Sequence, residues 1–83
     1  MKFRAEIDIM PLKTLLDPQG KAVSASMINV GISEITDVRI GKHITLEIDA
    51  ESKDIANKKV AEACSKLLAN QIMESFEFTL EKM

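Results

Sequence analysis

The sequence predicts an α+β fold in which six elements follow one another in the order β-α-β-β-α-β. Polar and apolar residues alternate over 2–10, 43–49 and 72–81, which is the period of strands buried on one face. Residues 18–30 and 52–68 instead repeat apolar side chains at helical spacing, behind residues that favour the start of a helix. These two patterns together predict helices packed on an antiparallel sheet.

The first strand is expected over residues 2–10 and ends at Pro11. Its apolar side chains share one face: Phe3, Ala5, Ile7 and Ile9. Asp17 and Pro18 then predict the start of a helix, because Asp is a favoured N-cap and Pro fits the first helical position. Gly31 is expected to close that helix as its C-cap. The helix presents one apolar face: Val23, Met27 and Val30.

A second strand is expected near 34–40 and a third over about 43–49, joined by a hairpin turn at Gly41 and Lys42. The turn is inferred because glycine accepts the positive φ that tight hairpin turns demand. The inward side chains of the two strands are apolar: Val38, Ile40, Ile44, Leu46 and Ile48.

Ser52 is expected to cap a second helix that runs to about Leu68, and Asn70 to end it. The last strand, over 72–81, turns its apolar residues inward: Phe76, Phe78 and Leu80. This element order is the split βαβ, or ferredoxin-like, arrangement. Because βαβ crossovers are right-handed, both helices are expected on one face of a four-stranded antiparallel sheet, within a single domain spanning 1–83.

Composition narrows the function classes. The 83 residues are 46% hydrophobic and 29% charged, as in soluble globular proteins. Eleven Lys and Arg against thirteen Asp and Glu give a net charge of −2, which lacks the basic field that nucleic acids or anionic membranes require. The N-terminus does not have the pattern of a signal peptide, and no apolar run approaches the length of a membrane span. A cytoplasmic protein is therefore expected.

Few residues are candidates for chemistry. Cys64 falls on the apolar stripe of the second helix and is interpreted as a core residue. His43 falls on the outward face of a strand, with no Ser or Cys placed to be activated by it. One Cys and one His also exclude an intrachain disulfide and a Cys-x-x-Cys metal site. The sequence thus predicts no catalytic, cofactor-binding or metal-binding residue.

Two helices would cover only one side of the predicted sheet. The uncovered side carries polar residues: Lys2, Arg4, Glu6, Asp8, Arg39, Thr45, Glu47, Glu77, Thr79 and Glu81. Three readings of that surface stay open: a solvated face, a polar docking or dimer face, or association through an edge strand.

Three motifs point to a family: LDPQGKAV at 16–23, DVRIGKHI at 37–44 and KLLAN at 66–70. Over essentially the whole chain, their sequence and spacing resemble the PurS family of phosphoribosylformylglycinamidine (FGAM) synthase subunits. The resemblance implies a non-catalytic accessory subunit of an ATP- and glutamine-dependent ligase of purine biosynthesis. It implies a dimer or tetramer that bridges a glutaminase subunit and a large synthetase subunit, and helps ammonia transfer for conversion of formylglycinamide ribonucleotide to its amidine.

The same resemblance implies that this chain binds no cofactor, and that ATP and Mg²⁺ bind to the large subunit. The implied subunit-interface residues lie at the start of the first helix and at the expected hairpin: Asp17, Pro18, Gln19, Gly20, Lys21, Arg39, Gly41 and Lys42. The alternative is an ACT-like ferredoxin-fold module that senses a small molecule, although the Gly-rich loop usual before its first helix is missing here.

Overall fold

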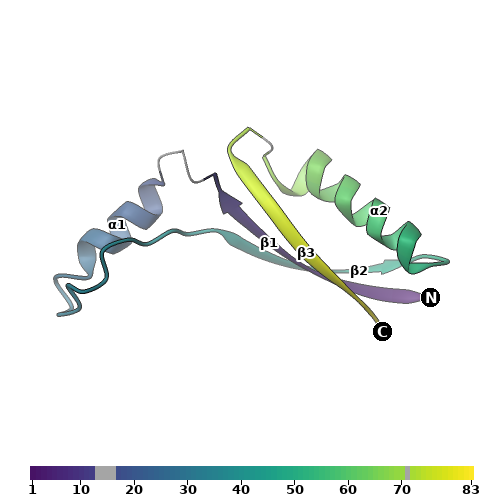
Figure 1. Cartoon of the computed structure of the whole chain (residues 1–83), viewed down its shortest axis with the longest axis horizontal. Coiled ribbons are helices and arrows are strands. Elements are labelled where there is room, and N and C mark those ends of the chain that lie inside the picture. The colour runs from purple at the N-terminus through teal and green to yellow at the C-terminus, as the bar shows by residue number, and fades with distance from the viewer. Residues whose placement is uncertain (13–16, 71) are drawn as a thin grey trace.

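The structure, a computed structural model, describes residues 1–12, 17–70 and 72–83, so part of the expected connection before the first helix lies outside the described residues. Its sheet is antiparallel, in the order β2-β1-β3 (Figure 1). The strands have these bounds: β1 (Lys2–Pro11), β2 (Lys42–Asp49) and β3 (Glu74–Lys82). All three agree with strands expected from the alternation of polar and apolar residues.

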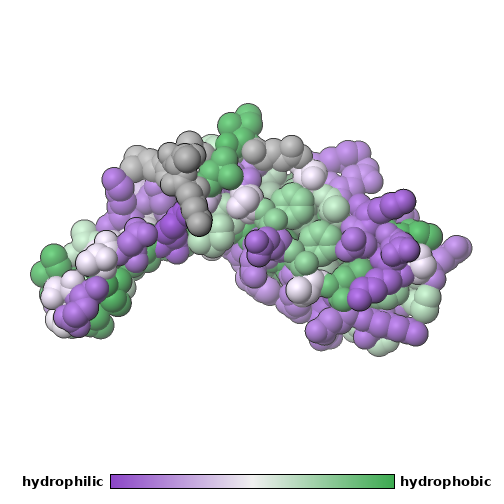
Figure 2. Space-filling view, viewed as in Figure 1, coloured by the Kyte–Doolittle hydropathy of each residue, from purple (hydrophilic) through white to green (hydrophobic). Residues whose placement is uncertain are grey.

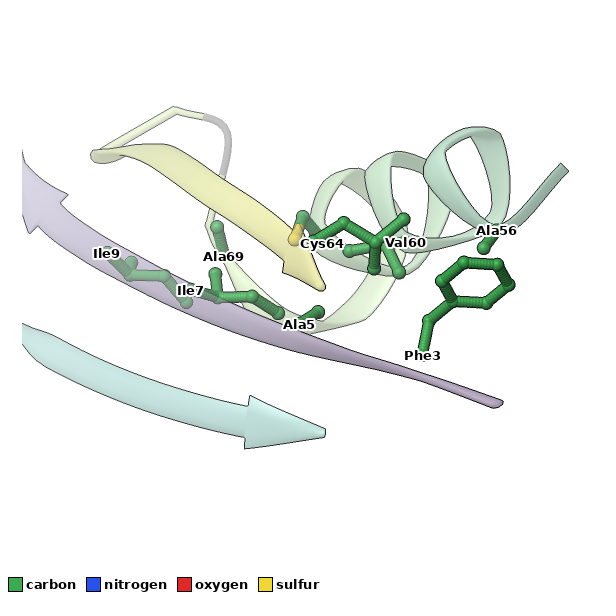
Figure 3. Close-up of a cluster of buried hydrophobic side chains, with 9 residues drawn as sticks. Phe3, Ala5, Ile7, Ile9, Ala56, Val60, Cys64 and Ala69 are labelled. Carbon is green, nitrogen blue, oxygen red and sulfur yellow. The ribbon is translucent and has the colours of Figure 1, made fainter. Parts of the chain in front are cut away.

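The core lies on one face of β1, the central strand. Its inward side chains are at most 2% exposed, as the alternation predicted: Phe3, Ala5, Ile7 and Ile9. Helix α2 (Lys53–Ala63) covers this face and is capped by Ser52, whose Oγ accepts the N–H of Ile55 at 3.2 Å. Figure 3 shows Val60 and Ala56 of α2 turned toward the side chains of β1. The predicted cap at Ser52 and the predicted inward face of β1 are confirmed, whereas Val30, predicted on an apolar helix face, is 67% exposed.

A π-helical turn, η1 (Cys64–Leu68), continues α2 to the predicted end at Leu68. Cys64 is fully buried, and desolvation by burial raises the pKa of its thiol, so the neutral form is favoured. Cys64 is therefore a packing residue of the core, as its place on the apolar stripe indicated.

The four-stranded sheet predicted from the sequence is wrong, because the described chain forms no strand over 34–40. The chain does not turn back at Gly41 but runs in extended form into β2 (Figure 1). Gly41 also lacks the positive φ of a hairpin glycine. It has another reason to be glycine, since a Cβ there would lie closer than 3.0 Å to the carbonyl oxygen of Ile9.

Helix α1 (Pro18–Ser26) ends earlier than the apolar spacing suggested. Ser26 Oγ donates to the carbonyl of Ala22 at 3.0 Å, a bond that competes with regular helix. Turns follow over 27–31, and Gly31 at their end has φ 82°. There the N–H of Ile32 donates to Met27 O at 2.9 Å and that of Gly31 to Ile28 O at 3.2 Å, the Schellman pattern. Gly31 therefore closes the turns that follow the helix, but the C-cap of α1 is Met27, so the C-cap role predicted for Gly31 is wrong.

The expectation that both helices cover one face of the sheet is also wrong. Because the chain does not turn at Gly41, α1 is carried beyond the end of the sheet and lies beside the extended residues 36–41 (Figure 1). We call residues 17–41 the arm. The molecule measures 51 × 26 × 14 Å, and its radius of gyration is 16.5 Å. A compact domain of this length would have about 12 Å.

Candidate functional site

The arm meets the sheet at a hollow of about 470 Å³, which we call the junction hollow. Its lining combines all three motifs noted in the sequence: Pro11, Asp17, Pro18, Gln19, Ile40, Gly41, Lys42, Asn70, Met73 and Glu74. The fold therefore brings the start of α1, the chain before β2 and the turn before β3 to one place.

Asp17 joins two of these segments. Its Oδ1 accepts the N–H of Gly20 at 3.0 Å, the cap that the sequence predicted. Its Oδ2 accepts the N–H of Ile40 at 2.9 Å, across 23 residues. These backbone bonds, that of Ile40 first, lower the pKa of the Asp17 carboxyl, and the nearby charge of Arg39 adds to the effect. One carboxylate thus both caps α1 and fixes its start to the extended chain.

Gly20 and Gly41 let backbones approach closely. A Cβ on Gly20 would lie closer than 3.0 Å to the carbonyl oxygen of Val38, and one on Gly41 would meet Ile9 O and Met10 Sδ. Neither position offers a side chain to a ligand. Both glycines are explained by the path of the chain on each side of the junction hollow.

Arg39 and Lys42 are also engaged within the chain. The guanidinium of Arg39 donates to the carbonyl of Pro11, and Lys42 Nζ lies 3.7 Å from Glu74 Oε2. Glu74 Oε1 in turn accepts the N–H of Asn70 at 2.8 Å. Asn70 and Glu74 were not among the predicted site residues. The KLLAN motif was the available signal for Asn70, whereas nothing local marked Glu74.

The three remaining predicted residues, Pro18, Gln19 and Lys21, have exposed side chains. Pro18 and Gln19 are exposed and line the junction hollow, while Lys21 is exposed one position past the buried Gly20. The side chains of Gln19 and Lys21 have no hydrogen bond or ion pair within the described part of the chain, so they are the side chains most available to a partner. The interface role of all eight residues stays a prediction.

His43 lies on the open face of the sheet between two carboxylates. Its Nδ1 is 2.7 Å from Asp8 Oδ1, and its Nε2 is 2.7 Å from Glu6 Oε2. These bonds, that to Asp8 first, raise the pKa of His43, and the bonds from His43 and Thr45 lower that of Glu6. An imidazole with an acceptor at each nitrogen is stabilised as the cation, so His43 acts as a clamp across β1 and β2.

Replacing His43 by Gln is expected to reduce stability at low pH more than at high pH. The pKa of His43 is raised in the folded chain, so its contribution is full below the ordinary value of 6.5 and is lost as pH rises through the folded value. The difference in Tm between the chain and His43→Gln should therefore shrink as pH rises from 5.5 to 8.5. A difference that stays constant over this range would contradict the ionic clamp.

In the described ranges, no three His, Cys, Asp or Glu side chains lie close enough to hold a metal ion. No described helix is long and apolar enough to cross a membrane. The arrangement instead uses its polar groups to fix an arm that extends away from the core. This defines a small subunit shaped for contact with other chains.

Comparison with known proteins identifies the subunit. The family described as PurS: Phosphoribosylformylglycinamidine (FGAM) synthase matches residues 4–82. The chain is 33% identical to phosphoribosylformylglycinamidine synthase subunit PurS of Bacillus subtilis over 81 residues, covering 98% of this chain and 95% of that protein. It is 38% identical to the subunit of the same name from Mycobacterium leprae over 78 residues, with 94% and 95% coverage.

Comparison with solved structures gives the same family. Bacillus subtilis PurS superposes with a TM-score of 0.87 at 34% identity, covering 96% of this chain and 99% of that one. A chain in the structure of PurLQS from Thermotoga maritima gives a TM-score of 0.88 at 30% identity, with 96% and 98% coverage. The chain belongs to the PurS family of FGAM synthase subunits. Membership confirms the resemblance and disfavours an ACT-like sensor.

Proposed function

We propose that this chain is the scaffold subunit of a cytoplasmic FGAM synthase, which self-associates through its arm and bridges the glutaminase and the large synthetase subunits. The large subunit then binds ATP and Mg²⁺ and forms the amidine of formylglycinamide ribonucleotide with ammonia released by the glutaminase. The observation that carries the proposal is the arm, because it extends beyond the sheet of its own chain and does not cover it. Likeness to a chain of the Thermotoga maritima PurLQS structure supports it.

The chain exposes more surface than a compact monomer of its mass would, and the arm carries exposed apolar side chains. Figure 2 shows hydrophobic residues gathered at its free end. Its exposed aliphatic side chains are between 38% and 69% accessible: Ile28, Val30, Ile32 and Ile35. The accessible surface of the chain is 6052 Å². A compact monomer of this mass has about 4,900 Å², so roughly 1,100 Å² is in excess. That is enough for one side of a stable interface, which needs about 800 Å².

The backbone of the arm supports a second copy as the covering partner. Within the described ranges, the N–H and C=O groups of residues 36–38 have no hydrogen-bond partner. The chain from there into β2 is extended, and β2 is an edge of the sheet. Two copies of this stretch can pair antiparallel about a two-fold axis near Gly41. Each arm would then lie against the other copy's sheet, an exchange of identical elements.

The bridging contact is assigned to the rim of the junction hollow. Asp17, Gly20 and Gly41 serve the chain's own geometry. The side chains of Gln19 and Lys21 are instead exposed and unpaired in the described structure. A partner subunit that docks at this rim would use them without disturbing the fold. Alanine at Gln19 and Lys21 should therefore weaken assembly and leave the stability of the isolated chain unchanged.

The test is reconstitution of the synthase with and without this chain. Glutamine-dependent amidine formation is expected to fall roughly tenfold or more on omission, because transfer between subunits depends on holding them at high effective concentration. Formation driven by added ammonia should change little, since the large subunit carries that reaction. Equal glutamine-dependent rates in both mixtures would refute the scaffold role.

A further inference from the structure

β3 is an edge strand with unpaired backbone groups along its outer side. The N–H of Met83 donates to Lys2 O and that of Leu12 to Met73 O, so these two pairs are hydrogen-bonded pairs of the β1–β3 ladder. The register is constant between them. Hydrogen-bonded and non-hydrogen-bonded pairs alternate, which leaves the N–H and C=O of Phe76, Phe78 and Leu80 directed to the free edge.

The side chains of β3 on the open face of the sheet are acidic or neutral: Ser75, Glu77, Thr79 and Glu81. Glu77 and Glu81 are exposed, and neither side chain has a hydrogen bond or ion pair in the described part of the chain. Across the ladder, Glu77 faces Asp8, so negative charge gathers there, while Glu81 faces Arg4. Unpaired carboxylates therefore accompany the unpaired backbone of the same strand.

We propose that the free edge of β3 binds an extended segment of a partner protein that carries Lys or Arg residues facing Glu77 and Glu81. Strand addition satisfies the free backbone groups, and the charges select the partner and fix its register. Glu77 and Glu81 are four residues apart on a strand, a separation of about 13 Å. The matching segment has cations at positions i and i+4, both directed to the open face.

A second copy of this chain is a poor occupant of the edge. If two β3 strands paired antiparallel along their full length, the two Glu77 side chains would be diagonal neighbours on one face, about 7–8 Å apart or less. Each Glu81 side chain would lie on that same face, beside the Glu77 of the other copy. Four carboxylates would meet there without a cation from either β3 strand on that face. The arm also extends from β2, the opposite edge of the sheet, so the proposed dimer would leave β3 free. The inference therefore does not depend on the proposed dimer.

The test uses the full chain, labelled with ¹⁵N, and the synthetic peptide Val-Lys-Val-Thr-Val-Lys-Val. Binding is expected to shift the amide resonances of residues 74–82 and to weaken as salt is added. Two matched peptides separate the causes. One has Glu in place of both Lys, and the other keeps Lys but is N-methylated on the backbone nitrogens that would face the edge. Neither should bind. Binding of the N-methylated peptide with equal affinity, or shifts confined to other strands, would overturn the proposal.

Charge reversal tests the two carboxylates. Glu77→Lys and Glu81→Lys should each weaken binding of the Lys peptide roughly fivefold and improve that of the Glu peptide. Glu51→Lys makes the same change in net charge at an exposed position outside the sheet and should leave both affinities nearly unchanged. An equal loss in Glu51→Lys would mean that only net charge matters, and the assignment to β3 would fail. Absence of binding by the Lys peptide would also refute it.

Discussion

Lysine at Val30 and Ile32 together is expected to abolish the proposed self-association and leave the chain a monomer. These side chains are 67% and 41% exposed in the single chain and belong to the apolar end of the arm. Burying an aliphatic side chain of this kind contributes roughly 1.5–3 kcal/mol, so each loss should weaken association about tenfold to a hundredfold. Light scattering after size exclusion should then report the mass of one chain, 9.2 kDa.

The matched control is Leu67→Lys, which also replaces an exposed aliphatic residue by lysine but lies in η1, outside the arm. Leu67 is 82% exposed, more than either arm residue, so general loss of surface hydrophobicity is at least equal. The control should keep the mass of the unmodified chain. If the arm variant keeps that mass too, or the unmodified chain is already monomeric, the proposed role of the arm is wrong.

The parts of the fold that could be predicted are those decided locally. The alternation in β1 identified every inward residue, because a side-chain period of two fixes the faces of a strand regardless of its neighbours. Asp17 and Ser52 were recognised as caps since each acts on an N–H only three residues away. Gly31 was predicted as the C-cap of the first helix, but it closes the turns after α1, because the helix itself ends earlier.

Whether the chain turns at Gly41 could not be predicted from the neighbouring residues alone. A glycine between two alternating stretches predicts a turn, but the same residue permits close contact with another strand. Here Asp17 holds Ile40 from a distance of 23 residues, and Ile9 lies against Gly41. Contacts between segments far apart in the chain set this path, and with it the place of α1. Glu74 was missed for the same reason, because its link to Lys42 depends on the final arrangement of two strands.

Replacing Gly41 by alanine is expected to destabilise the chain by about 1–3 kcal/mol, the cost of forcing an extra methyl group into a packed site. Met10 Sδ can move aside, but the carbonyl of Ile9 belongs to the β1–β2 ladder, where Ile9 pairs with Lys42. Relief of the clash must therefore disturb that end of the ladder. Urea unfolding measures the loss of stability, and amide exchange at Met10 and Lys42 locates it. An unchanged midpoint would show that the backbones do not meet there.

Asparagine at Gly31 and at Gly41 separates two roles of glycine, which are to adopt a positive φ and to allow close approach of another backbone. Asn tolerates positive φ, so Gly31→Asn, where φ is 82° and no atom lies within 4 Å of the added Cβ, should cost little. If Gly41 formed a hairpin turn, Gly41→Asn would be tolerated equally well. Because it instead lies against the carbonyl of Ile9, Gly41→Asn should be at least as destabilising as Gly41→Ala. Equal stability of the two Asn variants would favour the hairpin and would remove the geometric basis for the arm.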